Sequence, residues 1–538
     1  MKRFTFVVLV FALLLYILEN TSIAGLHKYK PTLTADLVSN EYILSWPRIP
    51  YIAYYEVEVL SKPSDDAYNP SALQSIIKYR TWKNNITIDK NFPFRTYWRV
   101  SAQGLFQRPL GYYSDSINLS QIMGISAEDF YNIKPIPISN YDIDNPASEK
   151  SMLTWSKVEG AVSYEIEILS NPPENPNTTI PSRYRIHSTQ QIFTNGYNAN
   201  FSKYANPTVY WRVRALDYDG NPLGVYSDAT EIYIEHNLNL PLKPLINSDI
   251  NKDGRPAPLY PVYSWIPISG AVSYEVELTN APPENPNSTN PSKFRIWSKE
   301  VVGSSNCYDN QPRITPGVYF WRVRGLDMFG NPVGVYSDAH QFTVDLSHGS
   351  YIATFGDSIT HGGGAISYSP ADWEYSYQIY LQFTATNLGR SGDTSESMVE
   401  RFDRDVLPYQ PKFLLILGGT NSLRSGTTAL QVIKNLTVIR EKCLINGIRP
   451  IFLTLPPINP TAIDRAFNEE TAPNWREQFD LVNSFIRQQR YHIVLDPYFC
   501  NANRELPDHY AIDGLHPDIE GKKLIAQIIN ANWWRVTR

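Results

Sequence analysis

The stretch Tyr351-Ile-Ala-Thr-Phe-Gly-Asp-Ser-Ile-Thr360 runs from a short apolar segment directly into a serine. Residues 351–355 are mostly apolar or aromatic, which is typical of a short buried strand. Gly356 permits a tight turn directly after it, so Ser358 is expected at the carboxyl end of the strand. In a parallel α/β sheet that end carries the site, so this stretch predicts both a fold and a candidate nucleophile.

Predicted strands alternate with predicted helices from this stretch to the C-terminus. This alternation indicates parallel strands joined by crossover helices, hence a three-layer α/β domain over residues 348–538. The predicted strands are Tyr351–Phe355, Phe413–Leu417, Pro450–Leu455 and His492–Leu495, and the predicted helices are Thr428–Asn446, Trp475–Arg490 and Asp518–Ala531. The apolar residues expected to form the buried face of the first helix are Leu430, Ile433, Leu436, Ile439 and Leu444.

Reactive residue types fall at the ends of these strands. A serine nucleophile needs a base, and His516 supplies one because an imidazole titrates near neutrality. Asp513, three residues earlier, can orient the imidazole within one turn. The backbone N–H groups of Ser358 and Gly392 and the side-chain amide of Asn421 are the expected oxyanion donors. Asn421 also has a second interpretation, as the cap of the following helix.

A metal centre is not expected at these residues. Asp513 and His516 have a spacing that two metal ligands can share, but no third ligand stands beside them. The sequence therefore predicts a site that works without a metal or a cofactor.

Four blocks resemble those of the SGNH, or GDSL, hydrolase family. They begin with Gly356-Asp-Ser358 and include Gly392, Gly418-Gly-Thr-Asn421 and Asp513-Gly-Leu-His516, so the resemblance covers residues 348–538. It implies a flavodoxin-like fold and ester hydrolysis by Ser358, His516 and Asp513, with Gly392 and Asn421 at the oxyanion. The third block departs from the family pattern, because Ser422 stands where an Asp is often found. A degenerate, non-catalytic domain is the alternative.

Three upstream segments share one order of motifs, about 110 residues apart. In the second segment these are Trp155, the alternating run Tyr164–Ile168, Tyr210-Trp-Arg-Val213 and Gly224–Asp228. The alternation predicts antiparallel strands with an apolar face and a solvated face that carries the glutamates. The segments are predicted to be three all-β, immunoglobulin-like sandwiches at residues 25–125, 130–237 and 240–345.

The repeated motifs resemble those of fibronectin type III domains, which implies a spacer or a binding module. The repeated tryptophans are expected in the cores, because large aromatic side chains dominate core packing. Exposed aromatic residues elsewhere on these domains could bind a cell-surface glycan. The repeated tryptophans are Trp46, Trp98, Trp155, Trp211, Trp265 and Trp321.

The N-terminus has the features of an export signal. Lys2 and Arg3 precede the uncharged segment Phe4–Leu18, and small residues precede a cleavage site after Ala24. Retention of residues 1–24 as a membrane anchor is the alternative, although the segment is shorter than the ~20 residues that span a bilayer. The protein is therefore expected to be secreted, periplasmic or on the cell surface.

Composition narrows the class of protein. The net charge of −5, from 48 basic and 53 acidic residues among 538, argues against a nucleic-acid partner. Cys307, Cys443 and Cys500 are too few for a disulfide scaffold and are expected to be buried free thiols.

The substrate is predicted only by class. Trp373 and Tyr375 follow the nucleophile and are expected either to form a wall that stacks on sugar rings or to anchor their loop in the core. Export, aromatic β domains and a compact hydrolase together favour an esterase that deacylates, and in particular deacetylates, carbohydrate. A lysophospholipase or general short-chain esterase is the alternative enzyme. An adhesive or carbohydrate-binding surface protein is the alternative outside enzymes.

Overall fold

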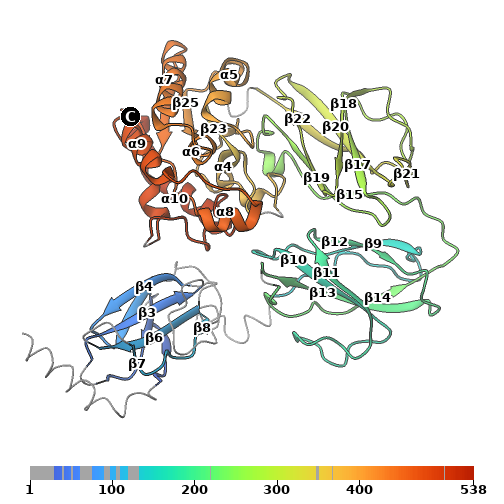
Figure 1. The fold of residues 1–538 in the computed structure, drawn as a ribbon. Coiled ribbons are helices and arrows are strands. Elements are labelled where there is room, and N and C mark those ends of the chain that lie inside the picture. Colours follow the sequence, from blue (N-terminus) through green and yellow to red (C-terminus); the bar gives the residue numbers. More distant parts are fainter. Residues whose placement is uncertain are drawn as a thin grey trace, which may run out of the picture. The chain divides into compact units, whose positions relative to one another are not determined.

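The computed structural model divides into two compact units, residues 1–129 with 500–509 and residues 130–499 with 510–538 (Figure 1). The predicted export signal, residues 1–24, lies outside the described residues. No helix of the described residues is both long and apolar enough to cross a membrane. The described residues are 30–38, 41–49, 52–60, 75–89, 97–104, 109–118, 133–218, 220–346, 351–365, 368–501 and 503–538.

Each repeat contains two antiparallel sheets. In the first repeat, one sheet has the order β1 (Thr34–Val38), β2 (Glu41–Ser45), β5 (Asn85–Asp89), and the other has the order β4 (Ser75–Thr81), β3 (Tyr54–Leu60), β6 (Tyr97–Gln103), β7 (Pro109–Leu110), with β8 (Ile117–Asn118) also on β6. In the second repeat, β12 (Gly196–Asn200) pairs with β9 (Lys150–Thr154), and the larger sheet is β11 (Arg185–Ile192), β10 (Ser163–Leu169), β13 (Thr208–Leu216), β14 (Thr230–Tyr233). In the third repeat, one sheet has the order β15 (Leu245–Ile246), β16 (Val262–Ile266), β19 (Asn306–Tyr308). The other has the order β18 (Arg295–Val302), β17 (Ser273–Thr279), β20 (Gly317–Leu326), β21 (Pro332–Val333), and β22 (His340–Val344) also pairs with β20. The region is thus strand-rich as predicted, and the likeness to fibronectin type III domains stays a prediction.

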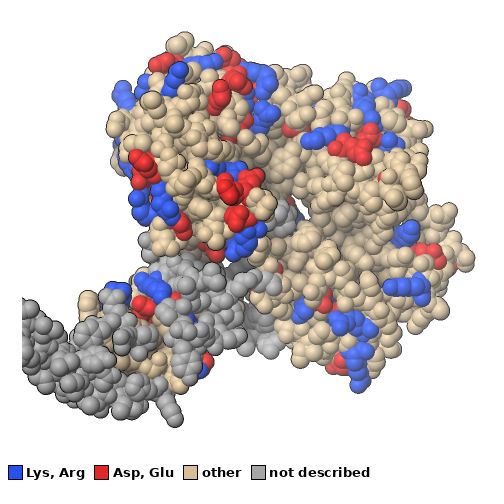
Figure 2. All heavy atoms as spheres, in the orientation of Figure 1, with Lys and Arg blue, Asp and Glu red and all other residues tan. Residues whose placement is uncertain are grey.

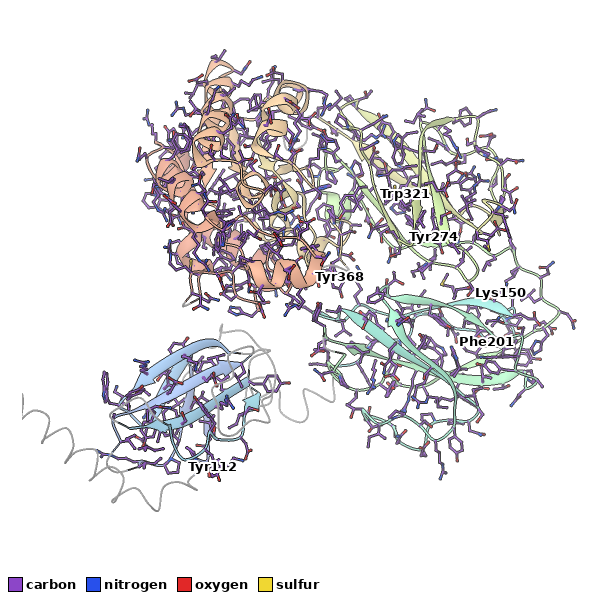
Figure 3. All side chains as sticks on the ribbon, in the orientation of Figure 1. Tyr112, Lys150, Phe201, Tyr274, Trp321 and Tyr368 are labelled. Carbon is purple, nitrogen blue, oxygen red and sulfur yellow. The ribbon has the colours of Figure 1, made fainter. Side chains whose placement is uncertain are left out.

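The repeated tryptophans form the cores of the repeats. All six are at most 2% exposed, and each pair belongs to a cluster of buried residues drawn from both sheets of its repeat. In the third repeat, Trp321 of β20 and Tyr274 of β17 belong to the same buried cluster (Figure 3). The prediction of core tryptophans is confirmed, so these rings offer no surface to a ligand.

Five of the six glutamates of the alternating runs are buried and Glu275 is partly buried, so their predicted solvated position is wrong. Glu277 of β17 is fully buried and faces Arg322 of β20 in the strand register. The Arg322 Nε donates to the Glu277 carboxylate at 2.6 Å, and the Tyr336 ring lies 4.1 Å from the guanidinium carbon. The same pairs recur as Glu58 with Arg99 and Glu167 with Arg212. The recurring motifs therefore encode one buried ion pair covered by a tyrosine.

The C-terminal sheet is parallel and five-stranded, in the order β24 (Thr386–Asn387), β23 (Ile352–Gly356), β25 (Phe413–Leu417), β26 (Arg449–Leu453), β27 (His492–Ile493). Numbered along the chain this order is 2-1-3-4-5, the order of flavodoxin-like sheets, which confirms the predicted α/β domain. β25 is buried at all five positions because helices cover its sheet.

Helices connect these strands and supply the residues at their ends. They are α4 (Ser358–His361), α5 (Ser395–Asp405), α6 (Thr420–Arg424), α7 (Ala429–Ile445), α8 (Pro460–Phe467), α9 (Trp475–Arg487) and α10 (Ile519–Thr537), with single-turn helices η3 (Trp373–Tyr375), η4 (Tyr377–Tyr380), η5 (Leu407–Tyr409) and η6 (Asp496–Phe499). One more single-turn helix, η2 (Lys252–Gly254), lies in the third repeat between β15 and β16. α5 contacts α7, and α7 contacts α9, while α10 packs against β27 and η4 (Figure 1). Charged residues of both signs are interspersed on the visible face of the molecule (Figure 2).

Two details differ from the sequence prediction. The buried face of α7 is Ala429, Val432, Asn435, Leu436, Ile439 and Cys443, whereas Leu430 and Leu444 are exposed. Spacings of three and four residues along the 3.6-residue helix place Cys443 rather than Leu444 on this face. Cys307 and Cys443 are buried as predicted, but Cys500 is exposed, because it lies in a loop after η6.

Candidate active site

Ser358 begins α4, directly after β23. Asp357 caps this helix, since its Oδ1 accepts a hydrogen bond from the Ile359 N–H at 3.0 Å. This cap fixes the turn between the strand and the helix, so the Ser358 hydroxyl is held at the carboxyl end of the sheet as predicted. The side chain is largely buried but retains some exposure.

His516 and Asp513 come together with Ser358 in a continuous chain of contacts. The Asp513 Oδ2 lies 2.8 Å from the His516 Nδ1, and the His516 Nε2 lies 2.9 Å from the Ser358 Oγ. A carboxylate accepts, so Nδ1 carries a proton and Nε2 can accept the serine proton. The Asp513 Oδ1 accepts from the backbone N–H groups of Leu515 and His516, both at 2.8 Å. The predicted three-residue turn therefore orients the base.

The other two predicted oxyanion donors lie in the loop before α5, which carries Gly392, and in the first turn of α6, which carries Asn421. Gly392 is exposed and has a φ of 85°, a conformation that favours glycine. The Asn421 Nδ2 donates to the Asp393 carbonyl at 2.9 Å, and its second N–H is a further donor. Gly419, not Asn421, is the N-cap of α6, so the interpretation of Asn421 as a helix cap is wrong.

Ser422 takes over part of the support that the family pattern assigns to an aspartate. Its Oγ accepts from the Ser395 N–H at 2.9 Å, at the first residue of α5. The Ser395 Oγ in turn accepts from the Asn435 Nδ2 at 2.9 Å. This chain of hydrogen bonds links α6, which carries Asn421, to α7 and to the start of α5, which follows the loop that carries Gly392.

Arg401 is a site residue that the sequence analysis missed. Its guanidinium donates to the carbonyls of Leu388 at 2.9 Å and Gly356 at 3.1 Å, and it pairs with the Asp393 carboxylate. It thereby ties the nucleophile loop to the Gly392 loop. Arg401 and Asp405 are spaced i,i+4 with Met398 and Phe402 on the buried side of α5, and this charged pair among apolar neighbours was the available signal.

Two buried charged groups lie under the nucleophile helix. The Lys522 Nζ donates to the Ile359 carbonyl at 2.8 Å, and burial lowers the pKa of this ammonium to about 7. Burial raises the pKa of Asp357 to about 6. Lys522 also acts electrostatically on Asp513 and Asp518, so it joins α10 to both parts of the site. The burial of Lys522 could not be expected from the sequence, because a lysine in a helix is normally exposed.

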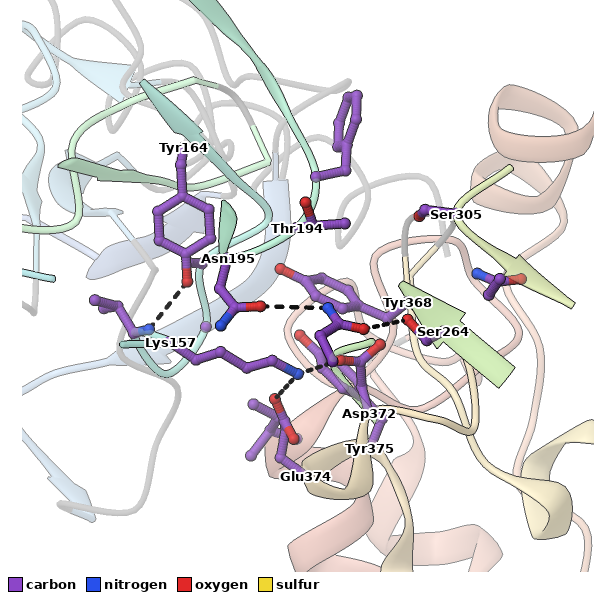
Figure 4. A pocket seen from close by; sticks show the side chains of 17 residues that line it. Lys157, Tyr164, Thr194, Asn195, Ser264, Ser305, Tyr368, Asp372, Glu374 and Tyr375 are labelled. Carbon is purple, nitrogen blue, oxygen red and sulfur yellow. Dashed lines mark hydrogen bonds and ion pairs between the residues drawn. The ribbon is translucent and has the colours of Figure 1, made fainter. Parts of the chain in front are cut away.

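Tyr375 and Trp373 anchor their loop. Tyr375 is 4% exposed and stacks on Tyr368 with the ring centroids 4.3 Å apart, so the sugar-stacking expectation is wrong for this residue. The Trp373 Nε1 donates to the Asp249 carbonyl at 2.7 Å. Both tyrosines line a pocket between the second repeat, the third repeat and this loop, across which Lys157 pairs with Asp372 and Glu374 (Figure 4).

No group of three or more His, Cys, Asp or Glu side chains within the described ranges is arranged to hold a metal ion. The imidazole of His516 is instead flanked by Asp513 and by the Phe467 ring, whose centroid is 5.9 Å away.

Residues 354–524 match the family model described as the GDSL-like Lipase/Acylhydrolase family. A 126-residue segment is 30% identical to the uncharacterized lipoprotein YqeF of Bacillus subtilis (strain 168), over 20% of this chain and 49% of that protein. The chain thus spans about half the length of this curated relative.

Solved structures are also similar to this chain. A putative acylhydrolase from Bacteroides fragilis is 20% identical, over 35% of this chain and 88% of that one, with a TM-score of 0.29. The lipase/acylhydrolase from Enterococcus faecalis is 23% identical, over 35% of this chain and 96% of that one, with a TM-score of 0.28. A catalytic mutant of an acetylxylan esterase from Geobacillus stearothermophilus is 16% identical, over 33% and 91%, with a TM-score of 0.26.

Proposed function

We propose that the GDSL-like lipase/acylhydrolase domain at residues 354–524 is an active carboxylic ester hydrolase with Ser358 as its nucleophile. The observation that carries the proposal is the contact chain from the Ser358 Oγ to the His516 Nε2, 2.9 Å, and from the His516 Nδ1 to Asp513, 2.8 Å. A serine hydroxyl is weakly nucleophilic alone, and this arrangement gives it a base already in the required tautomer.

The reaction proceeds through an acyl-enzyme. The Ser358 Oγ attacks the ester carbonyl carbon while the His516 Nε2 takes the hydroxyl proton, and Asp513 stabilises the imidazolium. The backbone N–H groups of Ser358 and Gly392 and the Asn421 amide donate to the oxyanion. His516 then gives its proton to the leaving alkoxide, and a water, activated by the same base, hydrolyses the acyl-serine.

The proposed substrate is an acylated, most specifically an acetylated, carbohydrate outside the cytoplasm. The segment 362–376 between the nucleophile and η4 is rich in Gly and Ser and contains no long apolar run, which disfavours a lipase lid. Export of the chain and a glycan-binding role of the β repeats belong to the same proposal. Trp82 of the first repeat is 82% exposed and is the aromatic residue best suited to such a contact.

Hydrolysis of a graded ester series by the full chain tests this proposal. The series is p-nitrophenyl acetate, butyrate, octanoate and laurate, together with acetylated xylan assayed by acetate release and lysophosphatidylcholine assayed by fatty-acid release. Preference for acetyl groups and release of acetate from the polysaccharide support the proposal. Preference for octanoate or laurate contradicts the substrate class and supports the lysophospholipase alternative.

Two serine variants make the assay specific. Ser358→Ala removes the proposed nucleophile, whereas Ser484→Ala removes an exposed hydroxyl of α9 and serves as the matched control. Full activity of Ser358→Ala would contradict Ser358 as the nucleophile. Failure of the wild type to hydrolyse any ester of the series would contradict an active hydrolase and would leave the repeats as the functional part of the chain.

A further inference from the structure

We propose that the third repeat is a working part of the active site, because the backbone carbonyl of Tyr260 holds His361 in the one tautomer that positions the Ser391–Gly392 turn. His361 is thus a positioning residue, and the segment that precedes β16 is its anchor. The inference rests on the proposed function, since the turn matters to catalysis only if the Gly392 N–H donates to an oxyanion.

The segment Leu259–Tyr260 is inserted against the hydrolase loops. The Leu259 N–H donates to the Asn387 carbonyl at 2.9 Å, at the end of β24. The Tyr260 carbonyl lies 2.7 Å from the His361 Nε2. Both residues are at most 1% exposed, and prolines at 256, 258 and 261 restrict the backbone around them. The segment is therefore a rigid, buried partner of the site.

The contacts of His361 allow only one tautomer. A carbonyl oxygen only accepts, so the proton is on Nε2 and Nδ1 carries a lone pair. Ser391 uses that lone pair, with its backbone N 3.2 Å and its Oγ 2.9 Å from Nδ1. Burial lowers the pKa of His361 to about 4, so the ring is neutral at pH 7 and Nδ1 stays an acceptor.

His361 joins the nucleophile to the proposed oxyanion donor. It is the last residue of α4, which begins at Ser358, and its Nδ1 holds Ser391, the neighbour of Gly392. The two loops also meet backbone to backbone, because a Cβ on Gly389 would lie 2.4 Å from the His361 N. A change at His361 therefore alters the position of the Gly392 N–H relative to the Ser358 Oγ.

The Tyr260 side chain anchors the carbonyl. Its hydroxyl donates to the Asp405 Oδ2 at 2.6 Å, and this carboxylate also accepts from Arg401 at 3.1 Å. The guanidinium carbons of Arg390 and Arg401 lie 5.5 and 5.8 Å from the centre of the Tyr260 ring. Tyr260 thus contacts the same arginine that ties Gly356 to Asp393, so the third repeat reaches the oxyanion loop by two routes.

The second repeat offers a control for a contact without this role. Glu159 pairs with Lys523 of α10 at 2.6 Å, but both side chains are substantially exposed. Such an exposed pair contributes little to stability, and the Lys523 ammonium pairs with Glu520 as well as with Glu159. Glu159→Gln is therefore the matched control for an interrupted contact between a repeat and the hydrolase domain.

The test uses the full chain with His361→Leu, His361→Asn, Tyr260→Ala and the control. Hydrogen exchange of the peptide 388–394 measures the position of the turn without reference to activity, and the hydrolysis of p-nitrophenyl acetate gives kcat and KM. Leu removes the three ring contacts of His361, one with the Tyr260 carbonyl and two with Ser391, whereas Asn retains an acceptor near the Nδ1 position. Thermal unfolding identifies any variant that is not folded.

We expect His361→Leu to exchange faster at 388–394 and to lose about 10- to 100-fold in kcat with little change in KM, as for a displaced oxyanion donor. His361→Asn should lose less kcat than His361→Leu. Tyr260→Ala should lose about 3- to 10-fold in kcat by the same mechanism. Glu159→Gln should match the wild type in both readouts.

Unchanged exchange in a folded His361→Leu protein overturns the inference, and so does faster exchange with an unchanged kcat. If His361→Leu does not fold, Tyr260→Ala decides by the same two readouts. If the wild type hydrolyses no ester and the variants still exchange faster, the proposed function fails while the anchoring of the turn stands.

Discussion

Two buried polar clusters of the second compact unit, one in the third repeat and one in the hydrolase domain, differ in what they leave available. Glu277 accepts from both Arg322 and Arg295 at 2.6 Å, and Arg322 donates further to the carbonyl and side chain of Asn285. In the hydrolase domain, by contrast, the Ser358–His516–Asp513 chain ends at a serine hydroxyl that retains some exposure, and Gly392 is exposed.

Burial and charge pairing therefore do not by themselves make a reactive site. In the Glu277 cluster the carboxylate is paired with arginines on neighbouring strands, so the cluster stabilises the fold of the third repeat. The Ser358 cluster places one hydroxyl against one imidazole nitrogen that can accept its proton, at a strand end beside the exposed Gly392.

Removal of the Ser358 hydroxyl should have the largest effect on ester hydrolysis. Ser358→Ala should lower kcat by about 10³-fold or more, because loss of one triad member disables the unit. The fold should be unaffected, as judged by circular dichroism and thermal unfolding. A kcat within tenfold of the wild type would remove Ser358 from the mechanism.

Asn421 tests the donors around that hydroxyl. Asn421→Ala should lower kcat by about 10²–10³-fold with little change in KM, because the donor acts on charge that develops only in the transition state. Asn421→Asp should be at least as poor, since a carboxylate repels the oxyanion. Near-normal kcat in Asn421→Asp would leave the backbone N–H groups of Ser358 and Gly392 as the complete oxyanion hole.

The closed cluster should respond in stability rather than in chemistry. Glu277→Ala leaves Arg322 and Arg295 without their buried carboxylate and should destabilise the third repeat by about 3–5 kcal/mol. Denaturant unfolding followed by tryptophan fluorescence measures this change. Glu300→Ala, at an exposed carboxylate of β18, is the control and should change stability by less than about 1 kcal/mol. Equal effects of the two variants would refute the closed-cluster interpretation.

The smallest expected effect is that of metal removal. Neither cluster combines three ligand side chains in metal-binding geometry among the described residues. EDTA should therefore leave ester hydrolysis unchanged. Loss of activity in EDTA with recovery on addition of zinc would replace the serine mechanism by a metal-assisted one.

The sequence predicted the hydrolase site better than the repeats. Strand ends can be located from short apolar runs, so Ser358, Asp513 and His516 were placed together from local pattern alone. Alternation along β17 correctly separated Glu277 from the core residues, but it could not show that Arg322 on another strand, with loop residues such as Asn285, covers that face. Alternation along one strand shows on which face a side chain lies, but it does not show which distant segments cover that face.

The same limit applies to Arg401 and to the contact of Tyr260 with His361. Each joins residues that are more than 40 positions apart or lie in different parts of the chain, as in the 101-residue separation of the Tyr260–His361 pair. Neither carries a local pattern that distinguishes it from a surface arginine or a loop tyrosine. The paired charges of Arg401 and Asp405 were a weak signal, and nothing in the Pro-rich segment 256–261, which lies inside the third predicted sandwich, indicates a contact with the hydrolase domain.

The most direct test of the account is the site of labelling by a fluorophosphonate, which reacts with an activated serine. The full chain is treated with the probe, digested, and its modified peptides are identified by mass spectrometry. If Ser358 is the activated nucleophile, the probe modifies Ser358 alone. Labelling is then lost completely in Ser358→Ala and is normal in Ser484→Ala. Modification of another serine with Ser358 unmodified, in a protein that hydrolyses esters, would contradict this role of Ser358.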